Sequence, residues 1–302
     1  MTHLSDAVVA HLTAELMLPE LPPRYLPQEV IGRGGMGVVW RCRDTLLERD
    51  VAVKLLVEHL SGAAWAARLA REARILAQLE HPGIVAVHDA GMLADGRAWY
   101  AMRLVVGEPL DRARGQLGTL GDVVRVMIRL ADTIAFAHAN GVIHRDLTPR
   151  NVMLGPFGEV LVLDWGVARL VAEGGSQDGA IVGTPGYHAP EQAAGQDGDA
   201  RSDVYGLGAI LRDLLRSLSV APPKPLAAIR DRAMAPRAEH RFATVVEFRA
   251  DLARFQDGAP VHAYLEPLGE RVLRLATQYR TPLLLVTAYL VMRLVVLWWR
   301  GI

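Results

Sequence analysis

The sequence predicts an α+β protein in which strands come first, helices follow, and a long apolar helix lies at the C-terminal end. Short β-prone runs occupy the first third of the chain, at 38–40, 51–54 and, as two strands around the turn Asp95-Gly96, within 84–110. Apolar residues at helical spacing mark the segments 63–80, 119–140, 203–218, 226–234 and 244–255. The segment 282–299 is almost wholly apolar. Strands followed by helices are typical of an α+β fold.

The composition narrows the class of protein. The 302 residues carry 33 basic and 33 acidic side chains, and no basic block indicates a nucleic-acid surface. The single cysteine, Cys42, excludes an internal disulfide and fits a reducing compartment. Residues 1–25 lack the charged start and long apolar run of a signal peptide, so we expect a flexible or loosely docked lead-in.

Lysine is rare in this chain, and its positions are informative. It occurs only at Lys54 and Lys224, among many arginines. Lys54 ends the apolar run 51–54, which we expect to be a strand. A lysine retained among so many arginines indicates a site that needs a compact ammonium group rather than a planar guanidinium.

A glycine-rich segment at 30–40 has the pattern G-x-G-x-x-G-x-V, with Gly32, Gly34, Gly37 and Val39 at the key positions. Glycine lets the backbone approach a phosphate without obstruction by a Cβ atom. Dinucleotide-binding folds use the same glycine pattern, but there a helix follows the glycines directly. Here a β-prone run follows, which favours a hairpin loop folded over a nucleotide.

The densest chemistry lies between residues 144 and 166. The octet His-Arg-Asp-Leu-Thr-Pro-Arg-Asn at 144–151 is followed by Asp-Trp-Gly at 164–166, and short apolar runs flank both. The oxygens of Asn151 and Asp164 are of the kind that Mg²⁺ prefers. Asp146 can orient or deprotonate an attacking hydroxyl. The layout therefore predicts a site for a divalent metal and a phosphate chain.

Together these motifs resemble those of the bacterial-type (Hanks-type) serine/threonine protein kinases. The spacing H-R-D-x-x-x-x-N with a following Asp-x-Gly resembles their catalytic and metal loops. The segment Gly-Thr-Pro-Gly-Tyr-His-Ala-Pro-Glu at 183–191 resembles their activation and P+1 loops. Small-molecule phosphotransferases of related fold lack the Ala-Pro-Glu part, so a small-molecule kinase is disfavoured. The resemblance covers residues 26–258.

The resemblance implies a two-lobed fold with ATP between the lobes, a small β-rich N-lobe at 26–106 and a larger α-helical C-lobe at 107–258. Glu72, on the helix at 63–80, would pair with Lys54 to position the phosphates. Met102 would be the gatekeeper before a hinge whose backbone meets adenine. The implied nucleotide contacts are Ile31, Gly32, Gly34, Gly37, Val39, Ala52, Lys54, Met102, Arg103 and Val105.

The resemblance also assigns the residues of the catalytic centre. Asp146 would orient the substrate hydroxyl, with Arg145 beside it, while Asn151 and Asp164 would hold Mg²⁺ or, in its place, Mn²⁺. Two further roles are structural: Asp203 would hold the catalytic-loop backbone, and Glu191 would pair with Arg241. We also expect phosphorylated Ser176 to dock on Arg145 and order the activation loop.

The function implied is an ATP-dependent serine/threonine protein kinase that transfers the γ-phosphate to protein hydroxyls and phosphorylates itself. The expected partners are protein substrates and ATP, with a homodimer as a further option. One residue departs from the family: a lysine usually stands two positions after the catalytic aspartate, where this chain has Thr148. Loss of that cation would cost several kcal/mol of transition-state stabilisation. The alternative function is therefore a nucleotide-binding pseudokinase that serves as a membrane-tethered signalling scaffold.

The C-terminal stretch predicts a membrane helix. Residues 259–281 form an arginine-containing juxtamembrane segment, and 282–299 are apolar except for Thr287 and Arg293. At about 1.5 Å per residue the stretch spans roughly 27 Å, near the thickness of the hydrocarbon core. We expect a single transmembrane helix in the cell inner membrane with the kinase on the cytoplasmic side. The alternatives are an interfacial or partner-binding helix and a cytoplasmic protein.

Overall fold

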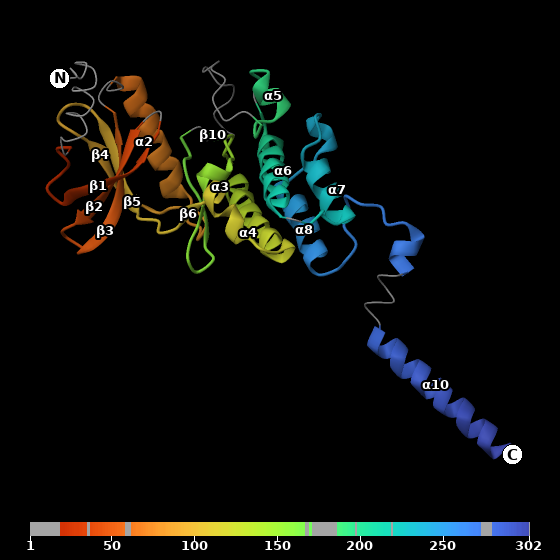
Figure 1. Ribbon diagram of the computed structural model, residues 1–302. Helices are drawn as coiled ribbons and strands as arrows, with labels where there is room; N and C mark the ends of the chain where they lie inside the picture. Colours follow the sequence, from red (N-terminus) through yellow and green to blue (C-terminus); the bar gives the residue numbers. More distant parts are fainter. Residues whose placement is uncertain are drawn as a thin grey trace, which may run out of the picture.

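The structure, a computed structural model, describes residues 19–34, 37–57, 62–166, 169–170, 186–196, 198–218, 220–272 and 280–301. Two lobes lie side by side, one built around a sheet and one built from helices (Figure 1). Helix α10 (Arg280–Arg300) follows them toward the C-terminal end. The α+β class and the two-lobed architecture predicted from the sequence are confirmed.

The N-lobe is a five-stranded antiparallel sheet with one helix against it. Its strands run in the order β1-β2-β3-β5-β4. Their bounds are β1 Tyr25–Arg33, β2 Gly37–Asp44, β3 Arg49–Leu56, β4 Val87–Met92 and β5 Ala98–Arg103. Helix α2 (Ala63–Gln78) contacts β3, β4 and β5. Successive side chains of a strand point to opposite faces, so Val51, Val53 and Leu55 enter one small core while Ala52 and Lys54 face the other side.

The C-lobe is helical, with short strands where the chain approaches the N-lobe. Its long helix α4 (Leu120–Ala139) begins with a capping box, in which Asp122 N donates to Thr119 Oγ1 at 3.1 Å and Thr119 N donates to Asp122 Oδ2 at 3.0 Å. The helix packs against α6, α8 and β9. The other helices are α3 Leu110–Ala113, α5 Pro190–Ala193, α6 Ala200–Ser217, α7 Lys224–Ala233 and α8 Val245–Gln256.

Short elements frame the loops between these helices. Strands β6 (Glu108–Pro109), β8 (Val152–Leu154) and β9 (Val160–Val162) form a small sheet, and β7 (Val142–Ile143) pairs with β10 (Arg169–Leu170). The 3-10 turns are η2 Arg114–Gln116, η3 Pro149–Asn151 and η5 Ala238–His240. The apolar runs predicted to flank the catalytic octet therefore do form short buried strands.

The end of the lead-in packs onto the N-lobe. Residues 1–18 lie outside the described part of the chain. Arg24 makes two hydrogen bonds to the buried Asp44, each of 2.8 Å, and Tyr25 OH donates to Asp89 Oδ2 at 2.9 Å. These contacts attach the start of β1 to β2 and to β4, the strand at the other edge of the sheet.

Helix α10 lies where the sequence predicts an apolar helix. From Leu284 to Trp299 its described apolar side chains are exposed. Arg293 stands within this stretch, and an arginine at the centre of a membrane helix costs about 3 kcal/mol on the insertion scale. Within the part of the chain that the structure describes, no helix is both long enough and apolar enough to cross a membrane. That finding goes against the membrane span predicted at 282–299.

Candidate active site

The sheet register gathers the predicted nucleotide contacts of the N-lobe on one face. Val39 pairs across the strands with Lys54, and Ala52 pairs with Met102. Cross-strand partners share a face, and so do residues two apart in one strand. Gly32, the cross-strand partner of Val39, extends the same line toward the glycine hairpin. The five residues therefore form one surface on the face of the sheet that carries Lys54.

The glycine hairpin joins β1 and β2 above this surface. Gly34 N donates to Gly37 O at 2.9 Å and closes the turn. A Cβ atom at Gly37 would lie only 2.6 Å from the Leu55 carbonyl oxygen, so this position admits no side chain. Ile31, at the irregular register of β1, is 46% exposed. The hairpin with its glycines is where the sequence predicts it.

Lys54 is held in a cluster of four side chains from four segments. Its Nζ donates to Glu72 Oε1 and Oε2 at 2.7 and 2.9 Å and to Asp164 Oδ1 at 3.3 Å. Tyr100 lies on the strand next to that of Lys54, and its OH donates to Glu72 Oε1 at 2.9 Å. The predicted pairing of Lys54 with Glu72 is confirmed. Tyr100 was not predicted, because only the register of β3 with β5 places it opposite Lys54.

The electrostatics of the cluster favour the charged forms of Lys54 and Asp164. Burial works against the charge on Lys54, but its neighbours Tyr100, Glu72 and Asp164 raise the pKa of Lys54 above its ordinary value. The packing around Asp164 likewise disfavours its charge, yet Lys54 lowers the pKa of that carboxyl. Burial raises the pKa of Tyr100 well above 10, so the phenol keeps its proton. At neutral pH the Lys54 ammonium thus faces the Asp164 carboxylate.

A buried aspartate of α6 holds the catalytic loop by hydrogen bonds to two of its backbone amides. Asp203 Oδ2 accepts from His144 N and Asp203 Oδ1 accepts from Arg145 N, both at 2.8 Å. His138 Nε2 lies 2.7 Å from Asp203 Oδ2. Burial disfavours a charged Asp203, but the hydrogen bond with His138 helps to hold its pKa below the ordinary value. The predicted role of Asp203 is confirmed, whereas the part of His138 was missed because nothing in the pattern of α4 sets it apart.

Asp146 and Asn151 lie together within this loop. Asn151 Nδ2 donates to the Asp146 carbonyl oxygen at 2.9 Å and to Asp146 Oδ2 at 3.2 Å. Leu163 N donates to Asn151 O at 2.7 Å, which brings the residue before Asp164 against the catalytic loop. The three residues predicted to act on metal and hydroxyl therefore converge.

Two residues of this centre have left-handed backbone conformations. Arg145 has φ +69° and Asp164 has φ +57°. Such conformations are strained for side chains with a Cβ atom, and they cluster at functional sites. Contacts on both sides hold them: Asp203 binds the amide of Arg145, and Arg68 Nε donates to the Gly166 carbonyl oxygen at 3.3 Å. The backbone strain thus falls on a predicted catalytic residue and a predicted metal ligand.

The residues present fit a divalent metal. Asp164 directs a carboxylate, 46% exposed, toward Lys54. The amide nitrogen of Asn151 faces Asp146, which leaves the amide oxygen as the free acceptor. Two hard oxygens suit an ion that completes its coordination with phosphate and water, as Mg²⁺ does. Among the described residues no group of three or more His, Cys, Asp and Glu side chains forms a metal cluster.

The position of the missing lysine is now defined. Thr148 is 2% exposed at the start of η3. Arg150, two residues on, is 78% exposed and its Nε lies 3.4 Å from Asp111 Oδ2. Arg150 therefore pairs with α3 rather than with the catalytic centre.

The segment after the activation loop is anchored beneath the catalytic loop. Arg241 donates to both oxygens of Glu191 at 2.7 Å, which confirms that predicted pair. His188 Nε2 lies 3.2 Å from Asp146 Oδ1, a contact that the sequence pattern did not indicate. Ser176 lies outside the described residues, so its expected docking on Arg145 stays a prediction.

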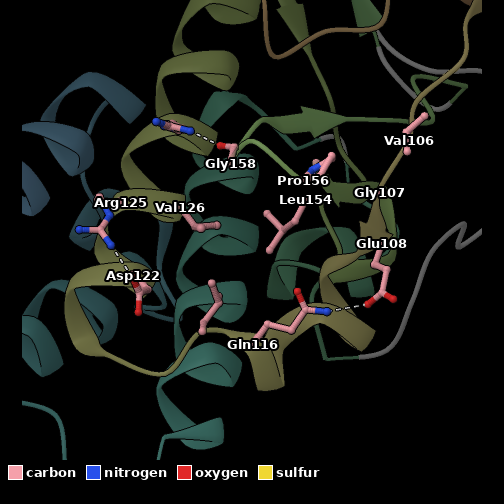
Figure 2. Close-up of a pocket in the computed structure, with 13 residues that line it drawn as sticks. Val106, Gly107, Glu108, Gln116, Asp122, Arg125, Val126, Leu154, Pro156 and Gly158 are labelled. Atoms are coloured by element: carbon pink, nitrogen blue, oxygen red, sulfur yellow. Dashed lines mark hydrogen bonds and ion pairs between the residues drawn. The ribbon is translucent and has the colours of Figure 1, made fainter.

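One pocket lies apart from the residues of the candidate site. A pocket of about 530 Å³ opens beyond the hinge between α4, η2 and the β8–β9 turn. Figure 2 shows Arg125 directed toward Asp122 and Gln116 toward Glu108 at its rim. None of the predicted site residues lines it.

The fold and the site define a nucleotide-dependent phosphotransferase. A glycine hairpin and a lysine–glutamate pair lie on the sheet, and an aspartate, an asparagine and a second aspartate lie below them. The sequence profile described as "Protein kinase domain" matches residues 25–245. The chain belongs to the protein kinase family.

The chain is similar to proteins named as bacterial serine/threonine kinases. It is 37% identical over 281 residues to the serine/threonine-protein kinase PknB of Mycobacterium tuberculosis, covering 80% of this chain and 44% of that protein. The kinase PknA of the same species is 42% identical over 198 residues, covering 63% of this chain and 46% of PknA. The chain therefore spans less than half of the length of these relatives.

A solved structure agrees with the fold. The kinase domain of Mycobacterium tuberculosis PknI superimposes with a TM-score of 0.61 at 27% identity, covering 78% of this chain and 97% of that one.

Proposed function

We propose that the protein is an ATP-dependent serine/threonine protein kinase that phosphorylates protein hydroxyls, itself included. The observation that supports this best is the convergence of Lys54, Glu72 and Asp164 in one contact cluster beside Asp146 and Asn151. We further propose that the kinase domain spans 26–258 and that 259–281 link it to the apolar stretch 282–299 of α10.

The roles proposed for the individual residues are consistent with the geometry. Lys54, held by Glu72, binds the α- and β-phosphates, and the hinge from Arg103 to Val105 meets the adenine through its backbone. Asn151 and Asp164 hold Mg²⁺ or Mn²⁺, which neutralises the charge of the phosphates. Asp146 orients the substrate hydroxyl, so that its oxygen lies in line with the γ-phosphorus. Catalysis of this kind rests on positioning and charge stabilisation.

The test is transfer of label from [γ-³²P]ATP with Mg²⁺ by the full chain, to itself and to a protein substrate. We expect labelled serine or threonine, and no label above background with Asp146→Ala at equal ATP affinity. A wild-type protein that binds nucleotide but transfers no label would instead favour the pseudokinase scaffold. The comparisons lend that alternative no support, since the relatives matched are named as kinases.

We propose in addition that α10 attaches the kinase to the cytoplasmic face of a membrane. The support is its exposed apolar surface, to which Leu290 and Leu297 contribute at 50% and 59% exposure. Apolar side chains of a helix bind the lipid boundary in proportion to the area that they bury. The full chain is expected to float with lipid vesicles and the double variant Leu290→Glu, Leu297→Glu to remain in the soluble fraction. Leu47→Glu, at an exposed turn of the N-lobe, is the control and should float like the wild type.

A further inference from the structure

His188 lies in the candidate active site, in contact with Asp146. Its Nε2 lies 3.2 Å from Asp146 Oδ1, and the two side chains are only 7% and 15% exposed. A clamp next to this contact holds the two segments together: Gln192 Nε2 donates to the Arg145 carbonyl oxygen at 2.8 Å, and Ala189 N donates to Gln192 Oε1 at 3.2 Å. Because Arg145 precedes Asp146 and Ala189 follows His188, the clamp keeps imidazole and carboxylate in register.

Both oxygens of Asp146 therefore have a partner. His188 reaches Oδ1, and Asn151 Nδ2 donates to Oδ2 at 3.2 Å. An attractive contact with a carboxylate requires a proton on Nε2, which the neutral Nε2–H tautomer and the imidazolium both carry. Two donors on opposite oxygens oppose rotation of the carboxylate about its last side-chain bond.

Neither Thr148 nor Arg150 brings a cation to Asp146. Thr148 is uncharged and buried, and Arg150 is turned to Asp111. His188 approaches from outside the loop, from the segment just before α5. A base that acts on a hydroxyl depends on its orientation, since small misplacements of reacting groups are costly in rate.

We propose that His188 is a positioning residue for Asp146, which it holds through an Nε2–H hydrogen bond in the orientation that meets the substrate hydroxyl. This inference rests on the proposed kinase function. In the reaction the hydroxyl oxygen bonds to the γ-phosphorus as the bond to the ADP oxygen breaks, and the hydroxyl proton passes to Asp146. His188 keeps its own proton throughout.

The test compares His188→Leu with His188→Gln in the full chain, with kcat, KM for ATP and unfolding temperature measured for each. Leucine has no donor, whereas the glutamine amide can still donate to Oδ1. We expect His188→Leu to lower kcat about tenfold, the effect of one lost hydrogen bond to a charged group, with KM for ATP unchanged. His188→Gln should recover most of that loss. His240→Leu, an exposed histidine of η5, is the matched control and should behave like the wild type.

Three results would overturn the inference. Leucine and glutamine variants as active as the wild type would show that the contact has no part in the reaction. A more active leucine variant would show that the imidazole obstructs the substrate. Equal loss in both variants at unchanged unfolding temperature would show that donation is not the cause. If His188→Leu unfolds more easily, His188→Met takes its place with the same expectation. A wild type that transfers no more label than Asp146→Ala contradicts the proposed function itself, and the inference falls with it.

Discussion

Asp164→Asn is expected to lower the rate of phosphoryl transfer about 10³-fold, the size of effect seen when one electrostatic contact to developing charge is removed. The substitution removes the negative charge that lies 3.3 Å from Lys54 and one of the two proposed metal ligands, while it keeps the shape of the side chain. Single-turnover kinetics at increasing Mg²⁺ concentration measures the effect. Affinity for Mg²⁺ in the presence of nucleotide should fall, whereas binding of nucleotide without metal should stay the same or become tighter.

Asp257→Asn is the matched control, because it removes the same charge at an exposed site after α8. Its rate and its Mg²⁺ dependence should equal those of the wild type. A rate for Asp164→Asn within threefold of the wild type at saturating Mg²⁺ would rule out Asp164 as a metal ligand in the reaction.

Those parts of the site that belong to strongly patterned elements were predictable from the sequence. Asp203 opens a helix with a clear apolar stripe, and Asp146, Asn151 and Asp164 occur between short apolar runs that become β7, β8 and β9. Glu72 follows from the same logic, since the alanine-rich helix α2 carries its apolar face against the sheet. In each case the apolar pattern of the sequence predicts the helix or strand, and the resemblance to the kinase motifs predicts the partner of the functional side chain.

Partners that depend on tertiary geometry were not predictable. Tyr100 reaches Glu72 only because β3 and β5 are adjacent in a sheet whose order is not that of the chain. His188 lies in a loop without periodic pattern, and the conformation that brings it to Asp146 depends on Gln192 and the Arg145 carbonyl. Its only signal in the sequence is a titratable residue within the segment 183–191. The membrane span was expected from apolar composition alone, which does not distinguish a helix that crosses a bilayer from one that exposes the same residues to another surface.

Arg241→Ala is expected to lower the free energy of unfolding by about 3–5 kcal/mol, the cost of removing one partner from a buried ion pair. The Arg241 side chain is 0% exposed, and all five of its N–H donors are used. Nε donates to the Ala235 carbonyl oxygen at 2.8 Å, and the two terminal nitrogens donate to Glu191, at 2.7 Å to each oxygen, and to the carbonyl oxygens of Arg201 and Pro236, both at 3.1 Å. Truncation would leave Glu191 and three carbonyl oxygens without this partner.

Urea denaturation of Arg241→Ala measures this loss, with a variant of the exposed Arg237, Arg237→Ala, as the control. A thermal scan should show the melting temperature lower by about 10 °C.

The pH dependence of the stability gives a second check. Although burial works against the charge of Glu191, Arg241 lowers the pKa of that carboxyl below its ordinary value. A group whose folded-state pKa is lowered stabilises the fold above its unfolded-state pKa and loses that contribution as the pH falls through the folded-state value. The difference in the free energy of unfolding between the wild type and Arg241→Ala should therefore be largest at pH 7. It should shrink in acid below about pH 4, the ordinary range of the glutamate pKa. A difference under 1 kcal/mol at pH 7 would mean that the carbonyl oxygens and Glu191 find water in place of the guanidinium.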